Sequence, residues 1–110
     1  MTARADAAGP VFAALADPTR RHLVRHLAET GEATATELAG DLPISRQAVS
    51  KHLALLEDAG LVAPARSGRE VRYRLTTPPL DAAMAWMAAV GARWDARLAA
   101  LDRHVRRSRR

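Results

Sequence analysis

The chain has 110 residues, enough for one domain with a modest core, and a formal net charge of +5 at pH 7. It contains no cysteine, which excludes disulfides, thiolate metal sites and thiol redox sensing. No apolar run reaches the roughly 18 residues of a membrane span, and residues 1–9 lack the apolar stretch of a signal peptide. We therefore expect a cytoplasmic protein with no membrane partner.

The charge is distributed unevenly along the chain. Residues 1–60 hold six basic and eight acidic residues, a balance of −2, whereas residues 61–110 hold eleven and four, a balance of +7. A basic surface confined to one region suits a polyanion such as nucleic acid. Sixteen of the seventeen cations are arginine, which a GC-rich genome would also produce, so composition alone does not decide the partner.

Two helices are predicted before Gly31. Four apolar residues indicate a short first helix: Val11, Phe12, Leu15 and Ala16. Asp17 and Pro18 are a good N-cap and first residue for the second helix. Its buried face consists of Leu23, Val24 and Leu27, and Gly31 ends it.

Residues 34–60 have the pattern of a helix-turn-helix. Thr34 and Glu37 have capping-box spacing and predict a short helix over about residues 35–41. Pro43 then breaks the helix, and Ser45 is a suitable N-cap for the next one, which ends at Gly60. Two helices joined by so tight a turn form a helix-turn-helix.

The second of these helices has two contrasting faces. Its apolar stripe consists of Val49, Leu53, Leu56 and Ala59. The opposite face carries Arg46, Gln47, Ser50, Lys51 and Ala54. Four of these side chains can donate to phosphates and base edges, as in a helix that reads the major groove of DNA.

Residues 61–76 read as a basic β-hairpin. Ser67-Gly68-Arg69 is a turn signal between two short runs, residues 61–66 and 70–76. In the second run Val71, Tyr73 and Leu75 alternate with Glu70, Arg72 and Arg74, which predicts one buried side and one mostly cationic side. The predicted fold is therefore a winged helix-turn-helix, mainly α with a small β-hairpin (α+β), forming a single domain over residues 1–110.

A long helix is predicted over about residues 79–106. Its apolar positions are separated by alternating steps of four and three residues: Leu80, Met84, Met87, Gly91, Trp94, Leu98, Leu101 and Val105. At 1.5 Å per residue this helix would span roughly 40 Å, more than so small a domain can cover. A second copy of the chain is the simplest partner for the stripe, although the stripe could also pack on its own domain. Trp86 lies off the stripe and could fill a seam or line a small pocket.

Taken together, these motifs resemble the ArsR family of winged-helix bacterial transcription repressors over residues 11–106. The matching segments are residues 14–21 (ALADPTRR), 37–39 (ELA), 45–53 (SRQAVSKHL), 56–62 (LEDAGLV) and 68–75 (GREVRYRL). Trp86 and the segment 94–98 (WDARL) look most like the metal-independent, SdpR-like branch.

The resemblance implies a homodimer joined by its first and last helices and bound to a palindromic operator in double-stranded DNA. It assigns DNA contact to Ser45, Arg46, Gln47, Ser50, Lys51 and His52, and to the wing residues Arg66, Arg69 and Arg72. The dimer interface would comprise Val11, Phe12 and Leu15 with Leu80, Met84, Met87, Gly91, Trp94, Leu98, Leu101 and Val105.

Several of these roles have a plainer reading. Arg46 and Gln47 could clamp phosphates rather than read bases, and Lys51 could be a solvated surface charge. His52 could be a half-buried histidine that orients the helix. Arg74 could pair with an acid, and the C-terminal arginines could form a disordered tail.

No metal, cofactor or catalytic site is predicted. Family metal sensors often carry a cysteine pair where this chain has Ala39 and Gly40, and Asp102-Arg103-His104 imitates only a fragment of the family's terminal-helix zinc site. His22 and His26 are one turn apart, but no third ligand is evident nearby, so an exposed histidine pair is the commoner explanation. No nucleophile with a base and no glycine-rich phosphate loop occurs, so the chain is not expected to be an enzyme.

The expected function is sequence-specific transcription regulation, with repression relieved by an unknown small-molecule or protein inducer. One rival is a protein-interaction module that recruits a partner through the terminal helix. The other is an architectural protein that binds DNA without sequence preference.

Overall fold

The computed structural model describes residues 7–109. Residues 1–6 and 110, which include most of the segment considered for a signal peptide, lie outside this range. The elements are α1 (Ala8–Leu15), α2 (Pro18–Thr30), β1 (Glu32–Thr34), α3 (Ala35–Ala39), α4 (Arg46–Asp58), β2 (Val62–Ser67), β3 (Glu70–Leu75) and α5 (Pro78–Ser108). Among these described residues, no helix is long and apolar enough to cross a membrane.

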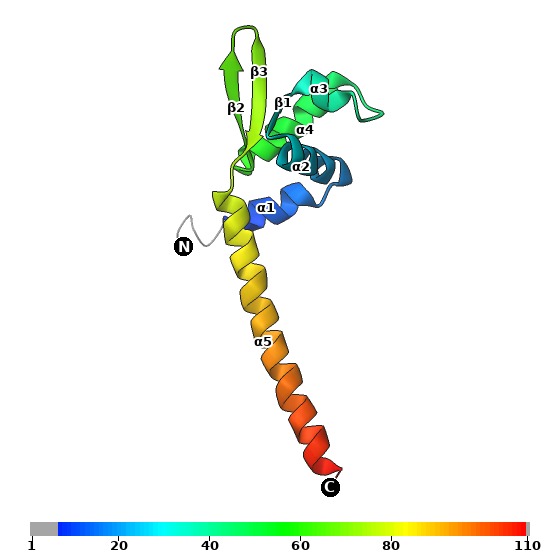
Figure 1. Cartoon of the computed structure of the whole chain (residues 1–110), viewed down its shortest axis with the longest axis vertical. Coiled ribbons are helices and arrows are strands. Elements are labelled where there is room, and N and C mark those ends of the chain that lie inside the picture. Colours follow the sequence, from blue (N-terminus) through cyan, green and yellow to red (C-terminus); the bar gives the residue numbers. More distant parts are fainter. Residues whose placement is uncertain (1–6, 110) are drawn as a thin grey trace.

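The molecule consists of a small body and one long projecting helix (Figure 1). Helices α1–α4 and the sheet form the body, and α5 leaves it beside α1 and extends far beyond it. The overall extents are 72 × 34 × 20 Å. The predicted fold class, mainly helical with a small β-hairpin and a long terminal helix, is confirmed.

The sheet has one strand more than the predicted hairpin. Strands β2 and β3 form the wing, with Ser67 opposite Glu70 and a left-handed Gly68 (φ +62°) in the turn. Strand β1 pairs antiparallel with the other edge of β3, placing Glu32 opposite Arg74 and giving the order β1-β3-β2. At three residues, β1 is too short to show the alternation by which strands are predicted.

The predicted caps hold the helix ends. The side chain of Asp17 accepts a hydrogen bond from the backbone of Arg20 (3.0 Å), and that of Ser45 accepts one from Ala48 (3.1 Å). At the end of α4, Gly60 has φ +78°, and a Cβ there would lie 3.0 Å from Cγ of Pro79. Glycine at position 60 therefore ends α4 and also lets the start of α5 approach.

The core lies between the helices of the body and the base of the wing. Its fully buried side chains are Val11, Leu23, Leu27, Leu38, Val49, Leu53, Leu56 and Leu61. Val11 thus belongs to the protomer's own core, so its predicted place in a dimer interface is wrong. Its residue type suited either role, and the packing of α1 against α5 and α2 decides which face of α1 is covered.

A charged cluster ties β1, α3 and β3 together. The Arg72 guanidinium lies 3.0 Å from a carboxylate oxygen of Glu32, 2.9 Å from one of Glu70 and 3.4 Å from one of Glu37. Hydrogen bonding to Glu70, with help from Glu37 and Glu32, raises the pKa of Arg72. Glu37 also completes the predicted capping box by accepting a hydrogen bond from the Thr34 backbone N–H (2.9 Å).

Replacing Leu53 with alanine should lower the free energy of unfolding by about 2–5 kcal/mol, because the change leaves a cavity in the core. Leu55→Ala is the matched control on the same helix. Leu55 is 49% exposed, and its loss should change stability by no more than about 0.5 kcal/mol. Urea unfolding at one fixed protein concentration measures both, and equal losses would contradict the assignment of the buried face.

The capping box of α3 should make stability depend on pH. The Thr34 backbone N–H, which donates to Glu37, lowers the pKa of that carboxyl. A lowered pKa adds stability that is present above the ordinary glutamate range and is lost as the pH falls through the pKa in the folded protein. Glu37→Gln keeps a capping acceptor but loses the charge. Wild type should be the more stable at neutral pH in urea unfolding, and this gap should close in acid; a gap independent of pH would contradict the assignment.

Candidate nucleic-acid interface

Helix α4 presents a polar face to solvent because its opposite face is buried. Val49, Leu53 and Leu56 are fully buried in the core. The side chains on the other side are all exposed: Ser45, Arg46, Gln47, Ser50 and Lys51. The five predicted contacts therefore occupy one accessible surface, with Ser45 also serving as the N-cap.

The wing and α4 meet in one hollow, which the linear sequence did not indicate. Arg46 and Ser50 line it from α4, and Arg69 lines it from the wing tip. The remaining lining residues are Thr34, Ala35, Thr36, Glu37, Glu70, Val71 and Tyr73. Two predicted groups of cationic and polar donors thus face a common concave surface.

Thr36 is a lining residue that sequence reasoning missed. It is exposed in the first turn of α3 and brings a hydroxyl to the same hollow as Arg46 and Arg69. The capping box placed Thr36 in a helical turn. The sequence contained no signal that this turn faces the wing, because that depends on how α3 packs against the sheet.

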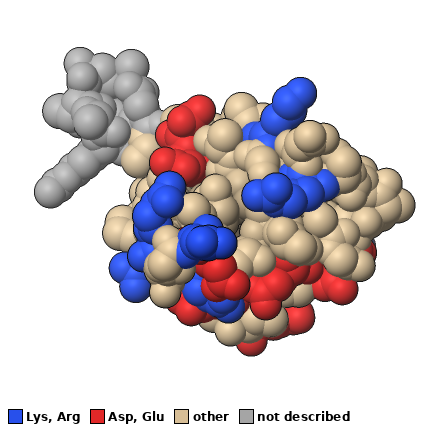
Figure 2. All heavy atoms as spheres, turned by 90° about the horizontal axis from the view of Figure 1, so that it is seen from above, with Lys and Arg blue, Asp and Glu red and all other residues tan. Residues whose placement is uncertain are grey.

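The cations on this end of the molecule do not form a continuous field. Figure 2 looks down on the end where the wing tip lies and shows separate groups of Lys and Arg side chains with Asp and Glu beside them. Glu37 and Glu70 themselves line the hollow. Both carboxylates accept hydrogen bonds from Arg72, whose positive charge offsets theirs next to the surface that would receive phosphates.

Arg72 does not fit the DNA-contact role that was predicted for it. It was expected to contact DNA, but its guanidinium is held among three carboxylates contributed by β1, α3 and β3. Within residues 7–109, Arg72 and not Arg74 is therefore the wing arginine that pairs with acids. Arg66 and Arg69 remain exposed, on β2 and in the turn.

His52 is directed inward, toward α2. Its ring Nδ1 lies 3.4 Å from a guanidinium nitrogen of Arg20 and 3.9 Å from a carboxylate oxygen of Asp17, and its side chain is 25% exposed. Arg20 in turn donates to the carbonyl oxygen of Ala14 (2.7 Å). His52 thus fits the orienting role better than DNA contact, because its Nδ1 lies against Arg20 and Asp17 at the N-terminal end of α2.

Helix α5 carries a long apolar face that the rest of the described chain leaves uncovered. The exposed members of the stripe are Met84, Met87, Trp94, Leu98, Leu101 and Val105, each 41–60% exposed. Leu80 packs against the core, and Ala83 is the buried residue of the helix. The alternative that the stripe packs on its own domain therefore fails beyond the first turns of α5.

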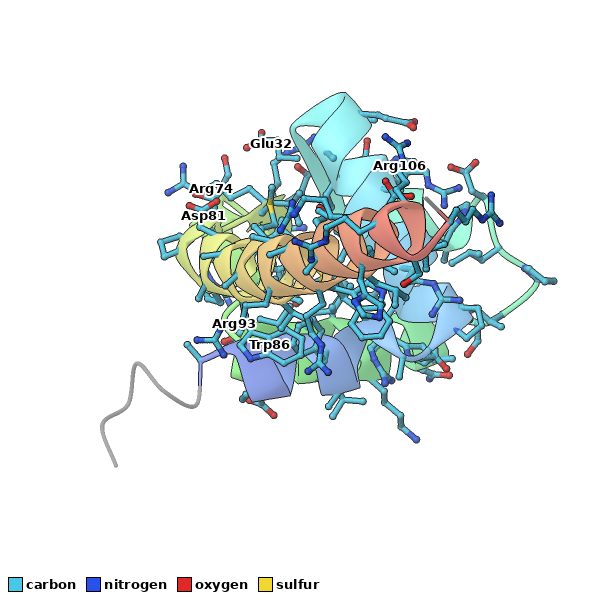
Figure 3. The ribbon with its side chains drawn as sticks, turned by 90° about the horizontal axis from the view of Figure 1, so that it is seen from below. Glu32, Arg74, Asp81, Trp86, Arg93 and Arg106 are labelled. Atoms are coloured by element: carbon cyan, nitrogen blue, oxygen red, sulfur yellow. The ribbon has the colours of Figure 1, made fainter. Side chains whose placement is uncertain are left out.

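Trp86 and Val90 are further exposed apolar side chains of α5 that lie off the heptad stripe. Trp86 makes an edge-to-face contact with Phe12 of α1 (ring centroids 5.5 Å apart), and Figure 3 shows it projecting from α5 toward that helix. Phe12 and Trp86 also line a small hollow with Ala8, Gly9 and Met87. Residues 103–108 continue the helix, so the disordered-tail alternative is wrong for them.

The predicted absence of a third ligand beside His22 and His26 is also wrong. Asp41, in the turn between α3 and α4, lies next to both histidines. Its carboxylate is 2.9 Å from Nδ1 of His26. The sequence separates Asp41 from the histidine pair by β1 and α3, so only the packing of these elements brings the three together.

The chain is similar to known transcription regulators. A family model described as a helix-turn-helix domain matches residues 15–65. The Bacillus subtilis transcriptional repressor SdpR is 36% identical over 77 residues, covering 70% of this chain and 84% of SdpR. The HTH-type regulator YuzN of the same organism is 48% identical over 65 residues, covering 54% of this chain and 71% of YuzN.

Solved structures agree over most of the chain. An ArsR-like transcriptional regulator from Rhodococcus sp. RHA1 has a TM-score of 0.79 at 40% identity, with 94% of each chain covered. A second structure, an ArsR family transcriptional regulator, has a TM-score of 0.75 at 33% identity and is covered over 97% of its length. Because the chain has the helix-turn-helix and the wing, and because its relatives are regulators of this kind, it belongs to the ArsR family of helix-turn-helix transcription regulators.

Proposed function

We propose that this protein is a homodimeric repressor that binds a palindromic operator in double-stranded DNA. The observation that carries the proposal is the common hollow lined by Arg46 and Ser50 of α4 and Arg69 of the wing. The exposed start of α4 would enter the major groove, where Arg46 reads guanine and Gln47 reads adenine. The wing would follow the phosphate backbone or the adjacent minor groove through Arg66 and Arg69.

A palindromic operator has two equivalent half-sites, and reading both of them requires two copies of α4. The exposed stripe of α5 supports pairing between two protomers, because six large apolar side chains on one helix remain about half exposed in the single chain. In such a dimer the two recognition helices read half-sites about 34–36 Å apart, or a multiple of that distance. Repression, rather than activation, is favoured by the relative SdpR, which is named a repressor.

The lack of cysteine argues against a thiolate metal sensor. Relief of repression would require an inducer that binds the DNA-incompetent form more tightly.

A small-molecule inducer would need a pocket. The edge-to-face pair of Phe12 and Trp86 borders a small apolar hollow between α1 and α5. We propose no enzymatic activity and no organic cofactor.

Arg46→Ala/Gln47→Ala should abolish sequence preference for the operator, since a good bidentate base contact supplies about 1–3 kcal/mol of discrimination. The probe is DNA from upstream of the protein's own gene, compared with a scrambled duplex by fluorescence anisotropy at about 150 mM salt. Wild type should prefer the operator by about 10³-fold or more. Arg93→Ala is the control. Arg93 is exposed on α5, so its replacement removes one positive charge, as Arg46→Ala does, but at a site away from the hollow.

Other outcomes of this measurement separate the rival functions. Equal and strongly salt-dependent binding to both duplexes would indicate an architectural DNA-binding protein. No binding to either duplex would favour a protein-interaction module that uses the exposed face of α5. If Arg93→Ala weakened operator preference as much as the double variant does, the assignment of α4 as the reading helix would be contradicted.

Leu98→Glu should convert the dimer into a monomer, because a carboxylate would be buried in the middle of the α5 stripe. Ala96→Glu is the matched control, since residue 96 is two positions from Leu98 and lies on the opposite side of the helix. Light scattering coupled to size exclusion measures the mass. Loss of the second half-site should also weaken operator binding by about 10²-fold or more. A monomeric wild type, or a dimeric Leu98→Glu variant, would refute this interface.

A further inference from the structure

Three metal-ligating side chains converge on the side of α2, outside the hollow between α4 and the wing. His22 and His26 are four residues apart and share one face of α2. Asp41 reaches them from the turn that connects α3 to α4. One ligand atom from each residue lies within 4.8 Å of the other two, and no second group of this kind occurs among residues 7–109.

One atom of this cluster lacks a partner. Nε2 of His22 is buried and makes no hydrogen bond with the described residues. Buried polar side-chain atoms almost always have a partner, so an unpaired nitrogen on a histidine of this cluster calls for one. Nδ1 of His26 and the carboxylate of Asp41 already pair with each other at 2.9 Å, so His22 is the member of the cluster that has an unpartnered buried nitrogen.

The chemistry of the three groups matches a divalent transition metal. Two imidazoles and one carboxylate are a common ligand set for Zn²⁺, and two histidines one helical turn apart present their rings to the same ion. A tetrahedral ion with bonds of about 2.1 Å needs ligand atoms about 3.4 Å apart. The widest separation would therefore have to shrink by at most about 1.4 Å, which Asp41 permits because its side chain is 55% exposed in a turn.

We propose that His22, His26 and Asp41 form a Zn²⁺ site with one open coordination position, and that its occupancy regulates DNA binding. Asp41 lies four residues before Ser45, the N-cap of α4. A metal held by α2 and by this turn would restrain the start of the recognition helix relative to the core. The site itself is independent of the proposed function, whereas its regulatory effect rests on it.

Metal binding is tested on untagged, chelator-treated protein without DNA. Titration with Co²⁺, followed by its visible absorption, and with Zn²⁺ against a chromophoric chelator should give one ion per protomer. His22→Gln and Asp41→Asn should each weaken binding by at least about tenfold, because even the loss of a supporting partner costs that much. His104→Gln on α5 is the control and should leave affinity unchanged.

Asp41→Asn keeps the experiment informative if His22→Gln fails to fold, since Asp41 is exposed and nearly isosteric with asparagine. The absence of a stoichiometric complex would overturn the site, as would binding that Asp41→Asn leaves intact or that His104→Gln abolishes.

The regulatory effect is tested by operator anisotropy with Zn²⁺-loaded and chelated protein. The two forms should differ in operator affinity by about fivefold or more, a coupling of ordinary size for two linked sites, and Asp41→Asn should remove the difference. Equal affinities would overturn the regulation. Failure of the chelated and the loaded protein alike to bind DNA would refute the proposed function, while the metal titration would stand or fall separately.

Discussion

Burial of one face of α4 is the constraint on which the rest of the structure depends. Val49, Leu53 and Leu56 are completely removed from solvent, and each contributes about 1.5–3 kcal/mol of transfer free energy. Because a helix is rigid, fixing this face also fixes the direction of the opposite one. The side chains able to contact DNA therefore owe their exposure and alignment to apolar residues that never meet the partner.

The wing is joined to β1 and α3 through charge as well as through strand pairing. Arg72 forms ion pairs with carboxylates of β1, α3 and β3. Two of those acids, Glu37 and Glu70, line the hollow between α4 and the wing. Individual exposed ion pairs contribute little to stability, so their more important effect here is on the local field. An arginine that was expected to touch DNA instead offsets negative charge where a phosphate backbone would approach.

Two features outside the hollow would affect how the recognition helices meet DNA. The exposed face of α5 offers a surface for a second protomer, which would set the spacing between two recognition helices. The His22, His26 and Asp41 cluster joins α2 to the turn before α4. In a dimeric repressor the first would determine which DNA geometry is accepted, and the second would determine how firmly each recognition helix is held.

The sequence by itself determined the features that arise from neighbours along the chain. Asp17, Thr34 and Ser45 marked helix starts because caps act within one turn, and the stripe of α4 was visible because a helix repeats every 3.6 residues. The tertiary structure alone decided which of two possible surfaces Val11 serves, which acids hold Arg72, and that Asp41 meets His22 and His26. These contacts join residues from separate elements, and their geometry depends on how those elements pack, which no local pattern records.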